Sequence, residues 1–223
     1  GGLTMKKKYL LAIPMAAGAY AFLVAPRMIN KPDVSVLKGV HYAHRGLFDN
    51  ESDAPENSLK AFQKAVDAGY GMEFDVQLSK DDIPMVFHDA TLKRMCGVDG
   101  NIWDYTAEEL PPSSSDQYDP IKDLTAFNES KVKQSNETIP TLKQVLEVVD
   151  GKAPLIIEYK MDRVTTKVCA LGNEILEKYK GTYCMESFHP LAVRWYRKHR
   201  SDIVRGQLSQ NFRKHGRKGI VYW

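Results

Sequence analysis

Two short apolar runs of the sequence, each typical of a buried strand, are interrupted by charged residues. In the first run, Glu73 and Asp75 stand two residues apart. In the second run, Glu158 and Lys160 have the same spacing. Side chains alternate across a strand with a period of two, so each pair shares one face of its strand. Because a buried carboxylate is costly without a partner, the pattern requires something that compensates these charges.

A bound divalent cation is one such partner. If the two charged faces meet, the carboxylates of Glu73, Asp75 and Glu158 converge. Three oxygen donors in one place are the ligands that a hard cation such as Ca²⁺ or Mg²⁺ prefers. The alternative for a Glu-x-Asp strand is a solvent-facing alternation with salt bridges. The second charged pair, on another strand, favours the metal site.

Two histidines stand at the ends of predicted strands, His44 beside Arg45 and His88 before an aspartate. Such histidines could bind zinc, act as a general acid and base, or be ordinary structural residues. An imidazole near its pKa can take a proton from an attacking oxygen or give one to a leaving oxygen. Arg45 and Lys160 add the fixed positive charge that suits an anionic phosphate. Together these residues favour metal-assisted attack on a phosphoester.

The elements that must position these residues alternate between strands and helices. Strands are predicted over Val40–Gly46, Met72–Leu78, Ile83–Asp89, Pro154–Lys160, Thr182–Phe188 and Ile203–Gln210, and helices over Pro55–Tyr70, Thr138–Gly151, Val164–Gly181 and Pro190–Asp202. A tight, hairpin-type turn joins the second and third strands. The alternation predicts a parallel sheet, either open and doubly wound or closed as a (β/α)₈ barrel. The first strand lacks a Gly-x-Gly-x-x-Gly motif after it, and polar residues gather at carboxyl strand ends, so the barrel is favoured.

Composition excludes some classes of protein. The chain has 223 residues and a formal net charge of +3, which is too small to indicate nucleic-acid binding. Its three cysteines are far apart and odd in number, so no disulfide framework is expected.

The N-terminal segment indicates export or membrane attachment. Lys6, Lys7 and Lys8 precede the uncharged apolar run 9–25. We expect an uncleaved membrane anchor, with a cleaved signal peptide or a soluble core helix as alternatives. The lysines should remain cytoplasmic, which places the following domain outside the cytoplasm, membrane-attached or secreted. Residues 1–37 thus form a basic terminus, an apolar segment and a linker, and residues 38–223 form the main domain.

Four motifs carry a resemblance to a known family. They are AHRG (Ala43–Gly46), PENS (Pro55–Ser58), EFDVQLSKDDIPMVFHD (Glu73–Asp89) and IEYK (Ile157–Lys160). In this order and spacing, the sequence resembles the glycerophosphodiester phosphodiesterase family. The resemblance implies a (β/α)₈ barrel of the phosphatidylinositol-phosphodiesterase-like type, with an inserted segment before the fourth strand, here about residues 90–136.

The resemblance also implies a reaction and its residues. Glycerophosphodiesters are cleaved to glycerol 3-phosphate and an alcohol, with Ca²⁺ or Mg²⁺, by attack of water or of the glycerol 2-hydroxyl. Carried over position by position, His44 and His88 are the acid–base pair, in either order, Arg45 and Lys160 bind phosphate, Glu73, Asp75 and Glu158 hold the metal, and Asn57 shapes the site.

The strand count departs from the family pattern. Six strands are predicted, whereas a closed barrel has eight and takes about 250 residues. We therefore expect a barrel truncated after about six strands, either as a fragment of a longer protein or with closure by another chain. The alternative functions are a lipid-directed, phospholipase D-like phosphodiesterase and a non-catalytic, membrane-tethered binding domain.

Overall fold

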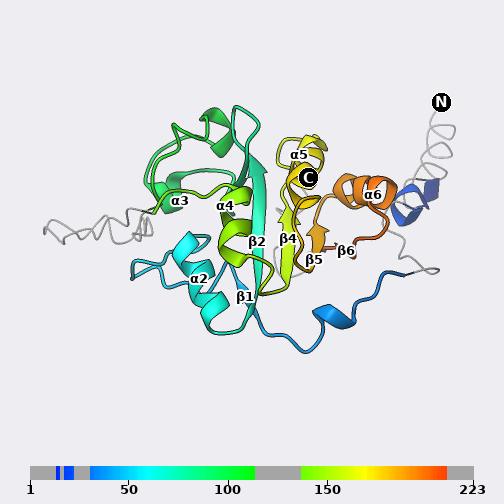
Figure 1. Cartoon of the computed structure of the whole chain (residues 1–223). Helices are drawn as coiled ribbons and strands as arrows, with labels where there is room; N and C mark the ends of the chain where they lie inside the picture. The colour runs from blue at the N-terminus through cyan, green and yellow to red at the C-terminus, as the bar shows by residue number, and fades with distance from the viewer. Residues whose placement is uncertain (1–13, 16–17, 23–30, 114–136, 210–223) are drawn as a thin grey trace, which may run out of the picture.

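The computed structural model describes residues 14–15, 18–22, 31–113 and 137–209 (Figure 1). The named elements are η1 (Ser35–Leu37), β1 (Tyr42–His44), α2 (Leu59–Asp67), β2 (Gly71–Leu78), β3 (Pro84–Val86), α3 (Lys93–Cys96), η2 (Ile102–Asp104), α4 (Leu142–Val149), β4 (Leu155–Tyr159), α5 (Lys167–Leu176), β5 (Tyr183–Ser187), α6 (Pro190–His199) and β6 (Arg205–Gln207).

One sheet runs through the described part of the chain, with the strand order β1-β2-β4-β5-β6. All four pairings along this path are parallel. Helices α2, α4, α5 and α6 lie between successive parallel strands along the chain, which is the connection that parallel strands require. This confirms the predicted α/β class, and the arrangement is that of part of a (β/α)₈ barrel.

The strand β3 is the exception, because it pairs antiparallel with β2 and lies off the parallel path. The turn that joins them contains Asp82 with a positive φ of 64°, and the Ser79 amide donates to the Ile83 carbonyl at 3.0 Å. The predicted hairpin-type turn is therefore confirmed. The third strand extends the long β2 as a hairpin and is not one of the parallel barrel strands.

Local signals fix the ends of the helices near the site. The Ser58 hydroxyl accepts a hydrogen bond from the Ala61 amide at 3.1 Å and caps α2. Gly69, with a φ of +72°, directly follows the C-capping residue Ala68 at the end of the helix. Helix α2 is shorter than the predicted range because Pro55–Asn57 form the turn before the cap.

Two hydrophobic clusters hold the described residues together. The larger one packs helices α2, α4, α5 and α6 against β2, β4 and β5, and includes the buried hydroxyl pair Tyr159–Tyr196 at 2.7 Å. The smaller one lies under residues 90–113 and consists of Met85, Phe87, Leu92, Met95, Ile102, Leu110 and Ile139. The first half of the predicted inserted segment is therefore anchored by a small core of its own.

Two predicted segments lie partly outside the described residues. The apolar run 9–25 is described only at 14–15 and 18–22, and residues 114–136 of the predicted insertion are not described. Among the described residues, every helix is too short or too polar to cross a bilayer. Membrane attachment and closure of the barrel stay predictions.

A glycine in the AHRG motif makes a testable packing prediction. Gly46 has a φ of +81°, and a Cβ built on it lies 2.9 Å from the carbonyl carbon of Ala61 in α2. Gly39 has a similar φ of +73°, but a Cβ there meets nothing within 4 Å. We expect Gly39→Ala to cost about 1–2 kcal/mol at most, from backbone strain alone, and Gly46→Ala to cost clearly more because α2 must move. Urea unfolding of both variants measures the difference, and equal costs would contradict the close approach.

Candidate active site

Three carboxylates converge at the carboxyl-terminal half of the parallel sheet. Glu73 and Asp75 project from β2, and Glu158 projects from β4, where it is in register with Asp75. All three are buried, and one oxygen from each lies within 4.8 Å of the others. The solvent-facing alternative for the Glu-x-Asp pair is therefore wrong, because Asp75 is only 1% exposed.

The carboxylate oxygens of this cluster that lack hydrogen-bond partners fit a hard divalent cation. Glu73 Oε2 and Asp75 Oδ2 are buried and have no hydrogen-bond partner among the described residues. The ammonium of Lys160 contacts Asp75 Oδ1 at 2.9 Å and Glu158 Oε1 at 2.7 Å. One ammonium thus offsets part of the negative charge, while orphaned carboxylate oxygens remain. An all-oxygen donor set of this kind suits Ca²⁺ or Mg²⁺.

Burial and mutual repulsion perturb the titration of the cluster. Burial, reinforced by Asp75 and Glu158, raises the pKa of Glu73 to about 8. Burial also raises the pKa of Glu158, although Lys160 opposes the change. For Lys160, burial acts to lower the pKa, but the charges of Asp75 and Glu158 outweigh it and leave the pKa raised. The lysine therefore remains charged beside the carboxylates.

The raised pKa of Glu73 predicts how the stability of the metal-free protein depends on pH. Above a pH of about 4.5, the unfolded chain has lost the Glu73 proton, whereas the folded protein keeps it up to about pH 8. The folded state binds more protons in this window, so its contribution to the free energy of unfolding falls as pH rises. We expect stability in chelator to decrease from pH 5 to pH 8, and Glu73→Gln to flatten that decrease.

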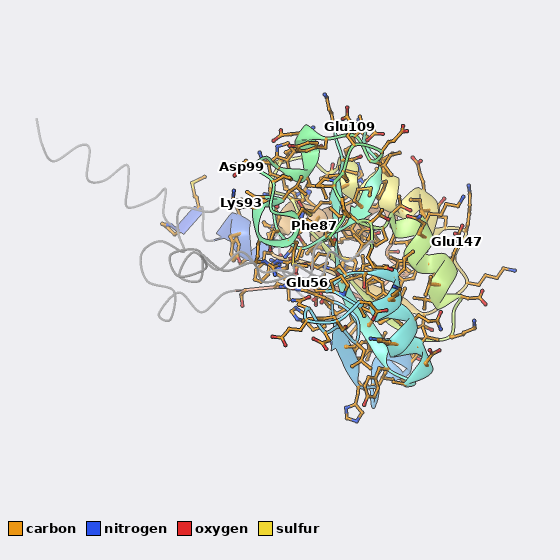
Figure 2. All side chains as sticks on the ribbon, turned by 90° about the vertical axis from the view of Figure 1, so that its left-hand side faces the viewer. Glu56, Phe87, Lys93, Asp99, Glu109 and Glu147 are labelled. Atoms are coloured by element: carbon orange, nitrogen blue, oxygen red, sulfur yellow. The ribbon has the colours of Figure 1, made fainter. Side chains whose placement is uncertain are left out.

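Chemical denaturation across this pH range is the measurement. The control is Glu147→Gln, since Glu147 lies on the outer surface of α4 with 64% of its side chain exposed (Figure 2). Identical pH slopes for the parent and Glu73→Gln would contradict the assignment of a buried, protonated carboxyl.

Arg45 and Asn57 lie beside the carboxylates, are joined by a backbone hydrogen bond, and both have a strained backbone conformation. Both have a φ of +60°, which is uncommon for residues other than glycine. The Arg45 amide donates to the Glu73 carbonyl at 2.8 Å, and the Asn57 amide donates to the Arg45 carbonyl at 2.9 Å. Arg45 Nε and both polar side-chain atoms of Asn57 are buried without a hydrogen-bond partner in the described structure. These groups are available to a ligand.

His44 lies at the end of β1, in register with Glu73 of β2. Its Nε2 is 3.6 Å from Glu73 Oε2, and 66% of its side chain is exposed. Burial of the rest of the ring and then the positive charge of Arg45 lower its pKa. A neutral imidazole at the solvent-facing side of the carboxylates is suited to accept a proton.

His88 reaches the site by a route that differs from the prediction. Because β3 is antiparallel, the chain runs back along β2 until the Phe87 amide donates to the Asp75 carbonyl at 3.0 Å. His88 and Glu158 then line one pocket of about 840 Å³. The location was predicted, but the reason was wrong, since His88 does not follow a parallel strand. Its Nδ1 lies 2.7 Å from Asp89 Oδ1, which leaves Nε2 for the pocket.

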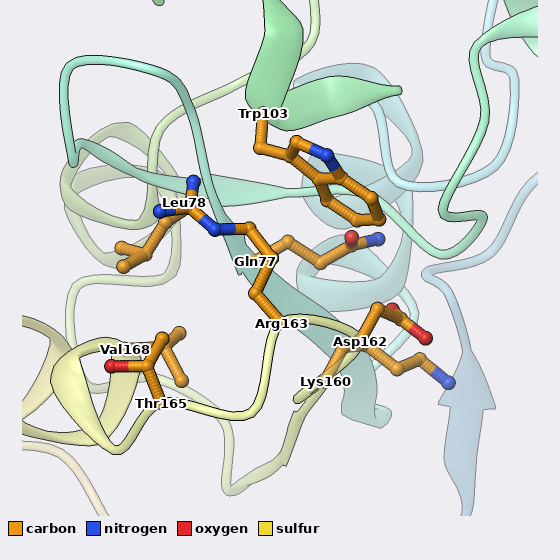
Figure 3. A pocket seen from close by; sticks show the side chains of 8 residues that line it. All are labelled: Gln77, Leu78, Trp103, Lys160, Asp162, Arg163, Thr165 and Val168. Carbon is orange, nitrogen blue, oxygen red and sulfur yellow. The ribbon is translucent and has the colours of Figure 1, made fainter. Parts of the chain in front are cut away.

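Four polar residues near the site were missed as site residues. Glu186 of β5 is in register with Glu158, and the rule that marked strand-end carboxylates could have found it. Gln77 follows Asp75 on the same face of β2 and lines a small pocket with Lys160, Trp103 and Asp162 (Figure 3). The other two are Glu56, which lies inside the PENS motif, and Arg94, which no local pattern marked.

Comparison with known proteins gives one consistent result. The model of the glycerophosphoryl diester phosphodiesterase family matches residues 44–218. A glycerophosphodiester phosphodiesterase of Caldanaerobacter subterraneus subsp. tengcongensis is 37% identical over 126 residues, covering 56% of this chain and 46% of that protein. A lysophospholipase D of Rattus norvegicus is 31% identical over 165 residues, covering 73% and 48%.

Comparison with solved structures agrees with the comparison of sequences. The structure of an Oleispira antarctica phosphodiesterase in complex with the product sn-glycerol-3-phosphate superposes with a TM-score of 0.62 at 28% identity, covering 78% of this chain and 67% of the other. The chain spans about half the length of the curated relatives it matches. The family match extends over most of the chain and includes every candidate site residue, so the chain belongs to the glycerophosphoryl diester phosphodiesterase family.

Proposed function

We propose that the protein hydrolyses glycerophosphodiesters to glycerol 3-phosphate and an alcohol, with a divalent cation and histidine acid–base catalysis. The observation that carries the proposal is the buried cluster of Glu73, Asp75 and Glu158, whose orphaned oxygens lie beside a charged lysine and two histidines. Membership of the family supports the same chemistry.

Glu73, Asp75 and Glu158 would hold the cation, Ca²⁺ or Mg²⁺. When bound, such an ion supplies positive charge that polarises a phosphate oxygen and neutralises charge developing in the transition state. The donor set has the all-oxygen character that both ions require.

The protein's own cations and imidazoles would carry the remaining steps. Arg45, whose Nε donates no hydrogen bond among the described residues, and Lys160 bind the phosphate anion. One of His44 and His88 takes a proton from the attacking oxygen, which forms the new bond to phosphorus. The other gives a proton to the alcohol oxygen as its bond to phosphorus breaks. The attacking oxygen is either that of water or the glycerol 2-hydroxyl, whose cyclic phosphate is then opened by water.

A second substrate class has support of its own, because one relative is a lysophospholipase D. In that case the diester carries an acyl chain, and the product is a lysophosphatidic acid. The third possibility is a domain that binds such diesters without cleaving them.

Product analysis separates these candidates. The purified protein is incubated with glycerophosphocholine or with lysophosphatidylcholine, and glycerol 3-phosphate, lysophosphatidic acid and choline are quantified. We expect glycerol 3-phosphate and choline from the first substrate. Preferential turnover of the lysolipid would favour the second class. Binding of either diester without product, in saturating Ca²⁺ or Mg²⁺, would overturn hydrolysis.

A further inference from the structure

A hydrogen-bonded network of charged side chains links Arg45, on one side of the site, to His88, on the other. Arg45 Nη1 donates to Glu56 Oε1 at 2.9 Å. Arg94 Nη2 donates to the same oxygen at 2.5 Å, and Arg94 Nη1 donates to Glu56 Oε2 at 3.0 Å. On its other side, Arg94 Nε donates to Asp89 Oδ2 at 2.6 Å and Nη2 donates to Oδ1 at 3.0 Å. Asp89 Oδ1 in turn faces His88 Nδ1 at 2.7 Å.

Arg94 is fully engaged by the protein, in contrast to Arg45. All three guanidinium nitrogens of Arg94 donate to Glu56 or Asp89. Arg45 keeps its Nε without a hydrogen-bond partner among the described residues. An arginine whose donors are all occupied by protein carboxylates is poorly placed to bind substrate, but its planar fork is well suited to fix two carboxylates relative to each other.

The two carboxylates in this network, Glu56 and Asp89, stay ionised. Burial acts to raise the pKa of Glu56, but the hydrogen bonds and charges of Arg94, followed by those of Arg45, hold it below its usual value. Burial likewise opposes ionisation of Asp89, yet His88 and Arg94 hold the pKa of that carboxyl well below its usual range. The network therefore persists as alternating full charges, where hydrogen bonds are short and strong.

The short helix that carries Arg94, α3, is held in place by packing. The neighbouring residues Leu92, at its N-cap, and Met95, within it, have buried side chains. Both belong to the small core under residues 90–113. Figure 1 shows α3 next to the segment that leads into α2 and carries Glu56. The core of the inserted segment thus sets the position from which the guanidinium reaches both sides of the site.

The backbone of His88 is fixed separately, by Gln77. The side-chain amide Nε2 of Gln77 donates to the carbonyls of Phe87, His88 and Asp89 at 2.8, 3.2 and 2.8 Å. With its main chain held from β2, the remaining freedom of His88 is rotation of its ring. The Asp89 carboxylate controls that rotation, and Arg94 controls the carboxylate.

We propose that Arg94 is a positioning residue, which acts through Asp89 to fix the orientation and tautomer of the His88 ring and, through Glu56, to set its place relative to Arg45. The catalytic consequence rests on the proposed diester hydrolysis, because it takes His88 as acid or base. With Nδ1–H donated to Asp89, the ring presents Nε2 to the pocket. A ring misplaced by about 1 Å can cost about 10²-fold in turnover.

Three variants test this. Arg94→Met removes the fork while keeping an unbranched side chain, and Arg94→Lys keeps the charge but cannot engage both carboxylates bidentately. Lys93→Met is the control, since Lys93 lies on the same helix and pairs with the exposed Asp99 at 3.2 Å. Each protein is checked by thermal unfolding, by ¹⁵N NMR of the His88 ring, and by kcat and KM for glycerophosphocholine.

We expect Arg94→Met to lower kcat about 10²-fold with KM changed only a few-fold, and to convert the His88 ¹⁵N signals from one tautomer to a mixture. Arg94→Lys should retain part of the parent's kcat and part of its single-tautomer signal, and Lys93→Met should match the parent in both. The proposal would be overturned if a folded Arg94→Met protein kept the His88 signals and the kcat of the parent. It would also be overturned if the substitution lowered the melting temperature and changed nothing else. If Arg94→Met does not fold, the same criteria apply to Arg94→Lys. The NMR readout needs no turnover, so a parent without activity counts against hydrolysis and leaves the test of Arg94 intact.

Discussion

Asp75→Asn is expected to remove nearly all diester hydrolysis. Asp75 is 1% exposed and lies at the centre of the cluster, 2.9 Å from the Lys160 ammonium and 3.9 Å from Arg45 Nε. The substitution keeps the shape of the side chain. It deletes one of the three carboxylates proposed to hold the cation, and it removes a negative charge beside Arg45 and Lys160, the two residues proposed to bind phosphate. If several kcal/mol of transition-state stabilisation depend on this group, kcat/KM falls by at least about 10³-fold.

The matched control is Asp162→Asn, because Asp162 is an exposed carboxylate that lines the same pocket as Lys160. It should leave kcat/KM within a few-fold of the parent. Initial rates of glycerol 3-phosphate release, together with calorimetric titration of Ca²⁺, distinguish the two variants. Comparable losses in both would show that negative charge near the pocket matters in general and would refute a specific role for the cluster.

His44→Ala and His88→Ala are each expected to lower kcat about 10²–10⁴-fold, which is the usual contribution of a positioned acid or base. KM should change less, because neither imidazole is assigned to hold the phosphate. Steady-state kinetics on both variants measure the effect. His199→Ala serves as the control, since His199 is exposed on α6 and stacks on Trp195 with ring centroids 4.4 Å apart. A kcat within a few-fold of the parent would mark that histidine as structural.

The carboxylates of the site could be predicted from the sequence because their spacing matches the geometry of a strand. The period-two pairs on β2 and β4 placed Glu73, Asp75 and Glu158 on one face, and the parallel register then brought Asp75 beside Glu158. The same regularity made the helices and the α/β class predictable. The cap at Ser58 and the helix end at Gly69 depend on local chemistry, which is the kind of signal that a sequence records.

Features that depend on contacts across loops could not be predicted in this way. The hairpin turn was recognised, but its consequence, that β3 carries His88 back along β2, appears only in three dimensions. Arg94 and Glu56 are 38 residues apart, and their pairing follows from how the small core of residues 90–113 packs. No periodicity in the sequence records that distance. The left-handed conformations of Arg45 and Asn57 are likewise imposed by tertiary hydrogen bonds.

The central claim is that the carboxylate cluster makes diester hydrolysis dependent on a divalent cation. The most direct test is to strip the purified protein with chelator and to follow glycerol 3-phosphate release while Ca²⁺ or Mg²⁺ is titrated back, with Asp75→Asn in parallel. We predict that chelation abolishes release, that one or both ions restore it saturably in the parent, and that the variant stays inactive throughout the titration. Release that is indifferent to chelation, or equal in the variant, would contradict the account.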